Sequence, residues 1–233
     1  MTPTVLITRP EAQGHAFAAK LRAAWDGAMD VVVSPLLRIA PIAADLPPCD
    51  AVILTSANGV AQAVRLGLAA GTTAYCVGPT TADAARDAGF LPVVGPGDAA
   101  GTVAMVCEKR PSGRLIHIRG EHARGDIAKA LTRAGLTCAD VVAYRQEPVA
   151  LNAAACAAVA GDAPIIAPVF SPRTAKLLAE AVPFRAPLHV VAISEAAVPD
   201  LAAADVIIAP RPDGGGMLDA TIIRLNALSN DVV

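Results

Sequence analysis

The stretch Val5-Leu6-Ile7-Thr8-Arg9-Pro10 is a β-branched apolar run that ends in a turn and is followed by an Ala-rich segment. A related stretch, Leu115-Ile116-His117-Ile118-Arg119-Gly120, returns in the middle of the chain and is also followed by such a segment. The pattern predicts a strand and a helix that occur in two copies. At a constant offset the matched residues are Arg9 with Arg119, Glu11 with Glu121, Phe17 with Ile127, and Leu21 with Leu131.

Two further pairs of segments match in the same way. Leu54-Thr55-Ser56-Ala57-Asn58 corresponds to Val169-Phe170-Ser171-Pro172-Arg173, and Val77-Gly78-Pro79-Thr80-Thr81 corresponds to Ile193-Ser194-Glu195-Ala196-Ala197. One such match carries little weight, because strand-to-helix units resemble one another in any Ala-rich sequence. Three matches together favour a duplicated unit.

Short apolar runs recur along the whole chain. Because they are apolar throughout and alternate with helical segments, they are typical of parallel sheets covered by helices on both faces, and we expect an α/β fold. Roughly ten strands are many for one sheet of this kind, which favours two sheets. A glycine run at 214–216 before the last predicted helix is expected to form a turn or a flexible entry to that helix. The runs lie at Val5–Thr8, Val31–Ser34, Ala51–Thr55, Thr73–Val77, Leu91–Val94, Leu115–Ile118, Val141–Tyr144, Ile165–Phe170, His189–Ile193 and Val206–Ala209.

The order of the matched units indicates an insertion. The Arg-containing unit comes first in one set, at Arg9, and last in the other, at Arg119, as expected if one domain interrupts another. Two short segments between the domains contain or are bounded by proline, so they could pair as a two-stranded hinge. The predicted parts are an outer α/β domain of residues 1–35 and 152–233, an inserted α/β domain of residues 44–142, and hinge strands at 36–43 and 143–151.

The composition excludes several classes of protein. With 54% hydrophobic and 17% charged residues, the 233-residue chain is too apolar to be disordered. Its formal net charge of -2 provides no overall positive field for a nucleic acid or an anionic membrane. The longest uncharged window, 66–82, is shorter than the about 20 residues that a membrane crossing needs. A polyanionic partner would therefore require a local site.

The expected compartment is the cytoplasm. The start of the chain lacks a basic region followed by an apolar core, so no secretory signal is expected. The five cysteines are scattered and form no Cys-x-x-Cys pair, which argues against a disulfide framework and against a zinc site.

Hydroxyl residues at predicted helix starts are the first candidates for a site, because no Walker loop or correctly spaced Rossmann fingerprint is present. They are Ser56, Thr80 with Thr81, and Ser171. In parallel sheets these helix starts lie at the carboxyl ends of the strands, where ligands bind, and their N–H groups favour a carboxylate. Ordinary helix capping stays open as the alternative.

Arginines near predicted strand ends are further candidates. Arg9, Arg119 and Arg124 follow predicted strands. Arg173 lies in the first turn of a predicted helix, where its charge opposes the helix dipole. Guanidinium groups bind carboxylates in a bidentate manner, so the four residues are consistent with an acidic ligand.

The two tyrosines differ in their setting. Tyr144 ends a predicted strand at the entrance to the hinge, where its phenol could donate a hydrogen bond to a leaving oxygen or simply pack. Tyr75 lies within an apolar run and is expected in the core.

Taken together, these motifs resemble the uroporphyrinogen-III synthase family over nearly the whole chain. Each motif is weak alone, and their order and spacing carry the resemblance. The motifs are Val5-Leu6-Ile7-Thr8-Arg9-Pro10, Leu54-Thr55-Ser56-Ala57-Asn58-Gly59-Val60, Val77-Gly78-Pro79-Thr80-Thr81-Ala82, Ile118-Arg119-Gly120, Val142-Ala143-Tyr144 and Phe170-Ser171-Pro172.

The resemblance implies two flavodoxin-like α/β domains joined by a two-stranded ladder, and a monomeric lyase of haem biosynthesis that needs no cofactor. Such enzymes act on hydroxymethylbilane, a linear tetrapyrrole with eight carboxylates. They expel its terminal hydroxyl as water, invert ring D through a spiro intermediate and close the macrocycle. The resemblance makes Tyr144 the candidate proton donor. The candidate substrate-binding residues, which include the four arginines above, are Arg9, Ser56, Asn58, Thr80, Thr81, Arg119, Arg124, Ser171 and Arg173.

One segment departs from the family pattern. Where the family often has a Gly-Pro-x-Thr turn, the outer domain has Ser194-Glu195-Ala196-Ala197. Glu195 could be a first-turn acid that complements a helix dipole. Two other functions stay open: a two-domain protein that binds or senses a small carboxylate by hinge closure, and a nucleotide-dependent transferase, which would lack a phosphate loop.

Overall fold

The chain divides into two compact units. The structure is a computed structural model that describes residues 1–122, 125–181 and 183–230. Unit 1 consists of Met1–Arg38 and Glu147–Val233, and unit 2 consists of Ile39–Gln146. Both boundaries fall inside strands, in β3 (Leu37–Pro41) and β8 (Thr137–Pro148). The predicted limits of the domains and of the hinge strands therefore stay a prediction.

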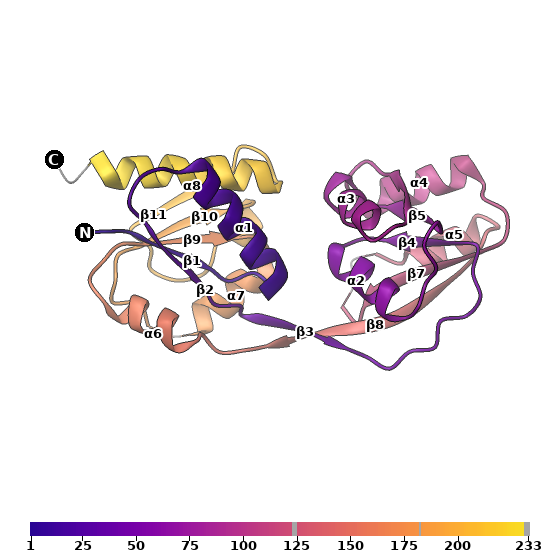
Figure 1. Cartoon of the computed structure of the whole chain (residues 1–233), viewed down its shortest axis with the longest axis horizontal. Coiled ribbons are helices and arrows are strands. Elements are labelled where there is room, and N and C mark those ends of the chain that lie inside the picture. The colour runs from indigo at the N-terminus through magenta and orange to yellow at the C-terminus, as the bar shows by residue number, and fades with distance from the viewer. Residues whose placement is uncertain (123–124, 182, 231–233) are drawn as a thin grey trace. The chain divides into compact units, whose positions relative to one another are not determined.

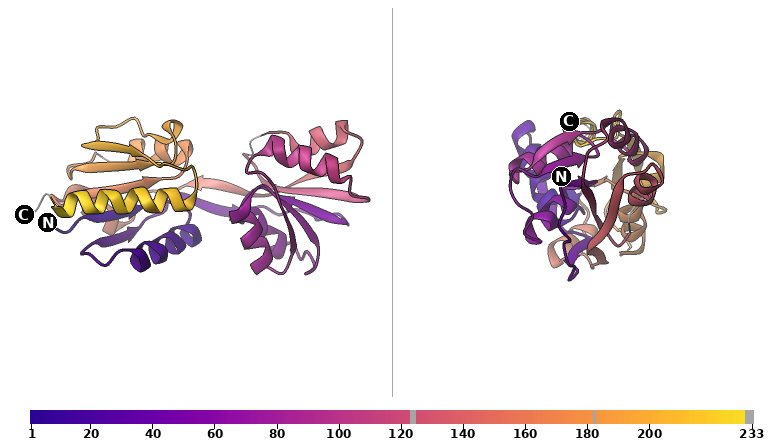
Figure 2. Two further views of the ribbon diagram at one scale, coloured as in Figure 1. Left: turned by 90° about the horizontal axis from the view of Figure 1, so that it is seen from above. Right: turned by 90° about the vertical axis from the view of Figure 1, so that its right-hand side faces the viewer.

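Unit 1 contains a parallel sheet with the strand order β11-β10-β9-β1-β2. Every residue of β1 and β9 is buried, because helices cover both faces. Helices α1 and α8 pack on one face, and α6, α7 and the short 3-10 helix η1 pack on the other (Figures 1 and 2). The elements are β1 (Thr4–Ile7), α1 (Glu11–Ala24), β2 (Asp30–Val33), α6 (Ala153–Ala160), β9 (Ile165–Val169), α7 (Pro172–Ala181), β10 (Leu188–Ala192), η1 (Glu195–Ala197), β11 (Asp205–Ile208) and α8 (Gly214–Asn230).

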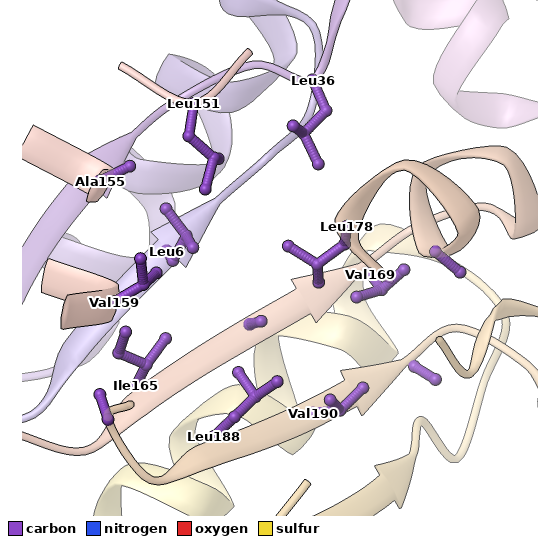
Figure 3. Close-up of a cluster of buried hydrophobic side chains, with 14 of the residues drawn as sticks. Leu6, Leu36, Leu151, Ala155, Val159, Ile165, Val169, Leu178, Leu188 and Val190 are labelled. Carbon is purple, nitrogen blue, oxygen red and sulfur yellow. The ribbon is translucent and has the colours of Figure 1, made fainter. Parts of the chain in front are cut away.

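The alternation of side chains along β1 divides the core of unit 1 into two layers. Leu6 joins the cluster beneath α6 and α7, where Leu178 of α7 is fully buried (Figure 3). Val5 and Ile7 point to the opposite face and pack with Phe17 of α1. The strand is thus covered from both sides, as its uninterrupted apolar run predicts.

Unit 2 contains the second sheet, with the order β3-β8-β7-β4-β5-β6. The pairs from β8 to β6 are parallel. Helices α2 and α3 cover one face, and α4 and α5 cover the other. Tyr75 of β5 is 6% exposed, which confirms its predicted place in the core. The remaining elements are β4 (Ala51–Leu54), α2 (Ala57–Arg65), β5 (Thr73–Cys76), α3 (Pro79–Asp87), β6 (Leu91–Val94), α4 (Ala99–Lys109), β7 (Arg114–Gly120) and α5 (Ile127–Arg133).

The two sheets share one strand order, in agreement with the three matched sequence pairs. If β1, β2, β9, β10 and β11 are matched with β7, β8, β4, β5 and β6, both sheets read identically, with β3 added in unit 2. In unit 1 this is the flavodoxin order 2-1-3-4-5. Unit 2 has the same arrangement, but the first of its matched strands in the chain, β4, corresponds to β9, the third strand of unit 1. The prediction of an α/β fold with parallel sheets is therefore confirmed.

Of the two alternatives expected for Gly214–Gly216, the structure shows the helix entry: the three glycines form the first turn of α8, and Asp213 Oδ1 caps this helix by accepting the N–H of Gly216 at 2.7 Å. Two other local predictions were wrong. The segment after Ser194 forms only the three-residue η1, because Pro199 follows closely and cannot continue a helix. The strand that was predicted to end at Tyr144 continues to Pro148 as β8. No apolar run marks this polar end, which is extended because β8 neighbours β3 in the sheet. Just beyond it, the N–H of Val149 donates to the carbonyl of Leu36.

No helix within the described part of the chain is long and apolar enough to cross a membrane.

Candidate active site

The neighbouring strands β4 and β7 form the topological switch point of unit 2. Helix α2 follows β4 and packs on one face of the sheet, whereas α5 follows β7 and packs on the other. In open α/β sheets the crossovers diverge at such a point, and ligands bind there at the carboxyl ends of the strands. Ser56 lies at the end of β4, and Gly120 ends β7.

Two hydroxyl groups meet at this switch point. Ser56 Oγ and the Tyr144 hydroxyl oxygen lie 3.1 Å apart and share a hydrogen bond. Ser56 is also the N-cap of α2, since its Oγ accepts the N–H of Gly59 at 3.1 Å. Capping and a place in the candidate site are therefore not alternatives for Ser56, because one oxygen does both.

The ring of Tyr144 is held by the backbone of the neighbouring strand. A Cβ atom at Gly120 would lie 2.8 Å from Cε2 of this ring, so the missing side chain of Gly120 makes room for it. Tyr144 is 7% exposed. Contrary to the prediction, Tyr144 lies inside β8 and not at the end of a strand. Its hydroxyl reaches the switch point from the middle of a long strand.

The switch point of unit 1 lies between β1 and β9, which correspond to β7 and β4. Helix α1 follows β1 on one face, and α7 follows β9 on the other. Arg9 lies just beyond the end of β1. Ser171 lies at the start of α7, where its Oγ accepts the N–H of Thr174 at 3.1 Å. Both candidates from the outer domain thus belong to one switch point.

The guanidinium group of Arg9 packs on an aromatic ring. Its guanidinium carbon lies 4.0 Å from the centre of the Phe170 ring, and this ring packs edge to face on Phe17. Burial lowers the pKa of Arg9 to about 10, which still leaves it protonated at neutral pH. Within the described part of the chain, no acid shares an ion pair with Arg9. A partly desolvated guanidinium of this kind attracts a carboxylate.

Arg119, the sequence counterpart of Arg9, has quite different surroundings. It lies inside β7, not after it as predicted, because the strand runs on to Gly120. Arg119 Nε pairs with Asp140 Oδ2 at 3.1 Å, and its Nη1 donates to the carbonyls of Gly120 and Glu121. Most of its hydrogen-bonding capacity is used inside unit 2.

A single pair of corresponding positions explains this difference. Strand register pairs Ile7 with Val33 in unit 1 and His117 with Asp140 in unit 2, so Val33 occupies the position of Asp140. The acid that neutralises Arg119 is replaced by an apolar side chain near Arg9. Comparing the two copies at this position could have separated the arginines from sequence alone. No comparison of sequence positions predicts that Phe170 lies against Arg9, because that contact depends on tertiary packing.

The remaining candidates are distributed over both units. Thr81 is buried and Thr80 exposed in the first turn of α3, whose N-cap is Gly78. Asn58 and Arg173 are partly buried and have interaction partners. Arg124 lies outside the described residues. Across 1–122, 125–181 and 183–230, no three His, Cys, Asp or Glu side chains gather into a set of metal ligands.

The stability of the fold is expected to depend on pH through the carboxyl group of Asp140. His117 is 1% exposed, and its Nδ1 lies 2.8 Å from Asp140 Oδ1. This hydrogen bond is the main cause that lowers the pKa of Asp140; burial opposes it, and the charge of Arg119 adds to the lowering. A carboxyl group with a lowered folded-state pKa stabilises the fold above its unfolded pKa of about 3.9, and this contribution is lost as the pH falls through the folded value.

We expect Asp140→Asn to reduce the loss of unfolding free energy between pH 6 and pH 3, because the variant has no carboxyl group to protonate. Urea unfolding at several pH values measures this loss. Asp83→Asn, which removes an exposed acid on α3, is the control and should retain the wild-type dependence. An Asp140→Asn variant with the wild-type pH dependence would contradict the role given to this pair.

Comparisons with known proteins agree with these features. Residues 16–219 match the family described as uroporphyrinogen-III synthase HemD. The uroporphyrinogen-III synthetase structure from Helicobacter pylori matches at a TM-score of 0.63 and 15% identity, covering 96% of this chain and 99% of that one. A mutant uroporphyrinogen III synthase from Thermus thermophilus matches at a TM-score of 0.49 and 16% identity, covering 97% and 99%. A comparison with curated protein sequences gives no match. Because the family match spans most of its length, this chain belongs to the uroporphyrinogen-III synthase family.

Proposed function

We propose that this chain converts hydroxymethylbilane into uroporphyrinogen III, with loss of water and inversion of ring D, as a lyase of tetrapyrrole biosynthesis. Membership of the family supports the reaction. The observation that carries the proposed mechanism is the Tyr144 hydroxyl, which is held 3.1 Å from Ser56 at the switch point of unit 2. A phenolic hydroxyl at this position is a suitable proton donor for a leaving hydroxyl group.

In the proposed first step, Tyr144 donates its phenolic proton to the terminal hydroxyl of the substrate. The carbon–oxygen bond breaks and water leaves, while the adjacent pyrrole nitrogen supplies the electron pair that stabilises the resulting cation. When the macrocycle has closed, the pyrrole carbon that formed the new carbon–carbon bond loses a proton, which restores the phenol. The net change is the loss of one water molecule.

Positioning is the second task of the protein, because uncatalysed closure gives the isomer in which ring D is not inverted. We propose that Arg9 binds a substrate carboxylate, since its charge is partly desolvated and rests on Phe170. Further contacts to acetate and propionate groups are proposed for other candidate residues, which are Asn58, Thr80, Thr81, Arg119, Arg124, Ser171 and Arg173.

The oligomeric state, the compartment and the binding partners are proposed as follows. We expect a monomer in the cytoplasm that binds a small molecule and no nucleic acid. The net charge of -2 supports the last point, because the chain lacks the overall positive field that a nucleic-acid backbone attracts. Size-exclusion chromatography with light scattering tests the oligomeric state.

The decisive experiment supplies hydroxymethylbilane and separates the uroporphyrinogen isomers after oxidation. We expect isomer III to dominate with the protein present and isomer I to dominate without it. If isomer I forms in the same proportion in both samples, the proposed activity is wrong. Tight binding of the substrate without turnover would favour the carboxylate-binding protein instead.

A further inference from the structure

The hydrogen-bond inventory of Ser56 restricts where the proton of Tyr144 can point. A hydroxyl group has one proton and two acceptor lone pairs. Ser56 Oγ uses one lone pair to accept the N–H of Gly59, so it meets the Tyr144 hydroxyl, 3.1 Å away, with either its remaining lone pair or its proton. Only one proton can lie between the two oxygens, so either Tyr144 donates to Ser56 or Ser56 donates to Tyr144.

The two arrangements differ in what they leave for a substrate. If Tyr144 donates to Ser56, its proton points away from any ligand. If Ser56 donates to Tyr144, the phenolic proton is free to leave and the phenolic oxygen gains a hydrogen bond. The second arrangement becomes stronger as Tyr144 loses its proton, because a phenolate is a better acceptor than a phenol. A bond that strengthens during the reaction stabilises the transition state more than the ground state.

The local structure adds to this effect. Ser56 caps α2, so the hydroxyl pair lies at the N-terminal end of a nine-residue helix, where the helix dipole favours negative charge. The ring of Tyr144 cannot move freely, because the backbone of Gly120 lies directly against it. The distance between the two oxygens is therefore set by β7, β8 and the start of α2 together.

From this geometry we propose that Ser56 is a positioning residue that acts through Tyr144. Its hydroxyl donates to the phenolic oxygen, turns the phenolic proton outward and stabilises the phenolate that forms when the leaving hydroxyl is protonated. This inference rests on the proposed role of Tyr144 and gives Ser56 a role other than binding a substrate carboxylate.

The kinetics of Ser56→Ala test the proposal directly. We expect kcat to fall about 10-fold, which corresponds to about 1.4 kcal/mol, while KM changes less than about 2-fold. Ser56→Thr keeps a hydroxyl group and should recover most of the lost kcat. A large rise of KM with little change of kcat would instead identify Ser56 as a substrate ligand and overturn the proposal.

A double variant separates action through Tyr144 from independent action. Once Tyr144→Phe has removed the phenol, adding Ser56→Ala should lower kcat by less than about 2-fold further. If the two effects multiply, Ser56 acts independently and the inference is wrong. If Tyr144→Phe alone leaves kcat unchanged, the proposed role of Tyr144 fails, and this outcome is distinct from failure of the Ser56 inference.

A spectroscopic measurement gives a readout that does not depend on turnover. The chain has two tyrosines, so Tyr75→Phe leaves Tyr144 as the only phenol. In that background, Ser56→Ala should move the midpoint of the phenolate absorbance change to higher pH, because the phenolate loses a hydrogen-bond donor. An unchanged midpoint would show that Ser56 does not donate to Tyr144.

Loss of the helix cap needs its own control, because Ser56→Ala also leaves the N–H of Gly59 without its partner. Asp98 caps α4 in the same unit by accepting the N–H of Gly101 at 2.8 Å. Asp98→Ala should therefore cause a comparable loss of thermal stability and leave kcat near the wild-type value. If Asp98→Ala lowers kcat as much as Ser56→Ala does, the kinetic effect reflects stability alone and the proposal fails.

Discussion

Tyr144→Phe is expected to lower kcat by about 100-fold and to leave the fold intact. General acid catalysis typically contributes about 10² to 10⁴ in rate, and the lower end applies here because the pyrrole nitrogen itself drives out the leaving group. The change keeps the ring that packs beside Gly120 and removes only the hydroxyl. Ser56 Oγ retains its hydrogen bond from Gly59, so the loss of stability should stay within about 1 kcal/mol.

Initial rates of isomer III formation and a thermal unfolding curve together measure this effect. Slow turnover should also raise the share of isomer I, because spontaneous closure then competes with the enzyme. Tyr75→Phe is the matched control, since it removes a phenolic hydroxyl from the core of the same unit. A wild-type rate for Tyr144→Phe would remove Tyr144 from the mechanism, and a collapsed melting temperature would show that it mainly packs.

Arg9→Ala is expected to raise KM by about 10-fold or more while kcat changes little. A hydrogen bond to a charged group contributes about 1.5–3 kcal/mol, and the guanidinium of Arg9 has no acid partner within the described residues of the chain. Arg9→Lys should recover only part of the affinity, because an ammonium group cannot form a bidentate contact and stacks less well on Phe170.

The corresponding change in the other copy should behave differently. Arg119→Ala breaks the contact with Asp140 and removes two hydrogen bonds to backbone carbonyls, so its main effect should be a loss of unfolding free energy. Its KM should rise less than that of Arg9→Ala. Equal increases of KM in the two variants would mean that the different surroundings of the arginines do not separate their roles.

Features of the fold that depend on local pattern could be predicted from the sequence. Uninterrupted apolar runs such as Val5–Ile7 gave the parallel strands, because a strand covered on both faces needs apolar residues throughout. The matched pairs anticipated the common strand order, since equal spacing of Phe17 and Leu21 with Ile127 and Leu131 places the same helix against the same strand.

Features that depend on long-range contacts could not be predicted. The prolines indicated two extended segments that could pair, but no apolar run indicated that the strand of Tyr144 and the polar segment after it form one strand, β8. The hydrogen bond between Ser56 and Tyr144 joins two residues from different motifs, and only the order of β4, β7 and β8 in the sheet brings them together. The same holds for Arg9 and Phe170, whose contact requires β1 to pair with β9.

The interruption of unit 1 by unit 2 in the sequence has a consequence for the order in which the polypeptide acquires its structure. The strands of unit 2 from β4 to β8 are contiguous in the sequence, so this sheet can complete while synthesis continues. In unit 1, β1 can pair with β9 only after the whole of unit 2 has been synthesised, because unit 2 lies between Thr4 and Ile165 in the sequence. Unit 2, which holds Tyr144, can therefore fold while unit 1, which holds Arg9, still lacks its C-terminal strands.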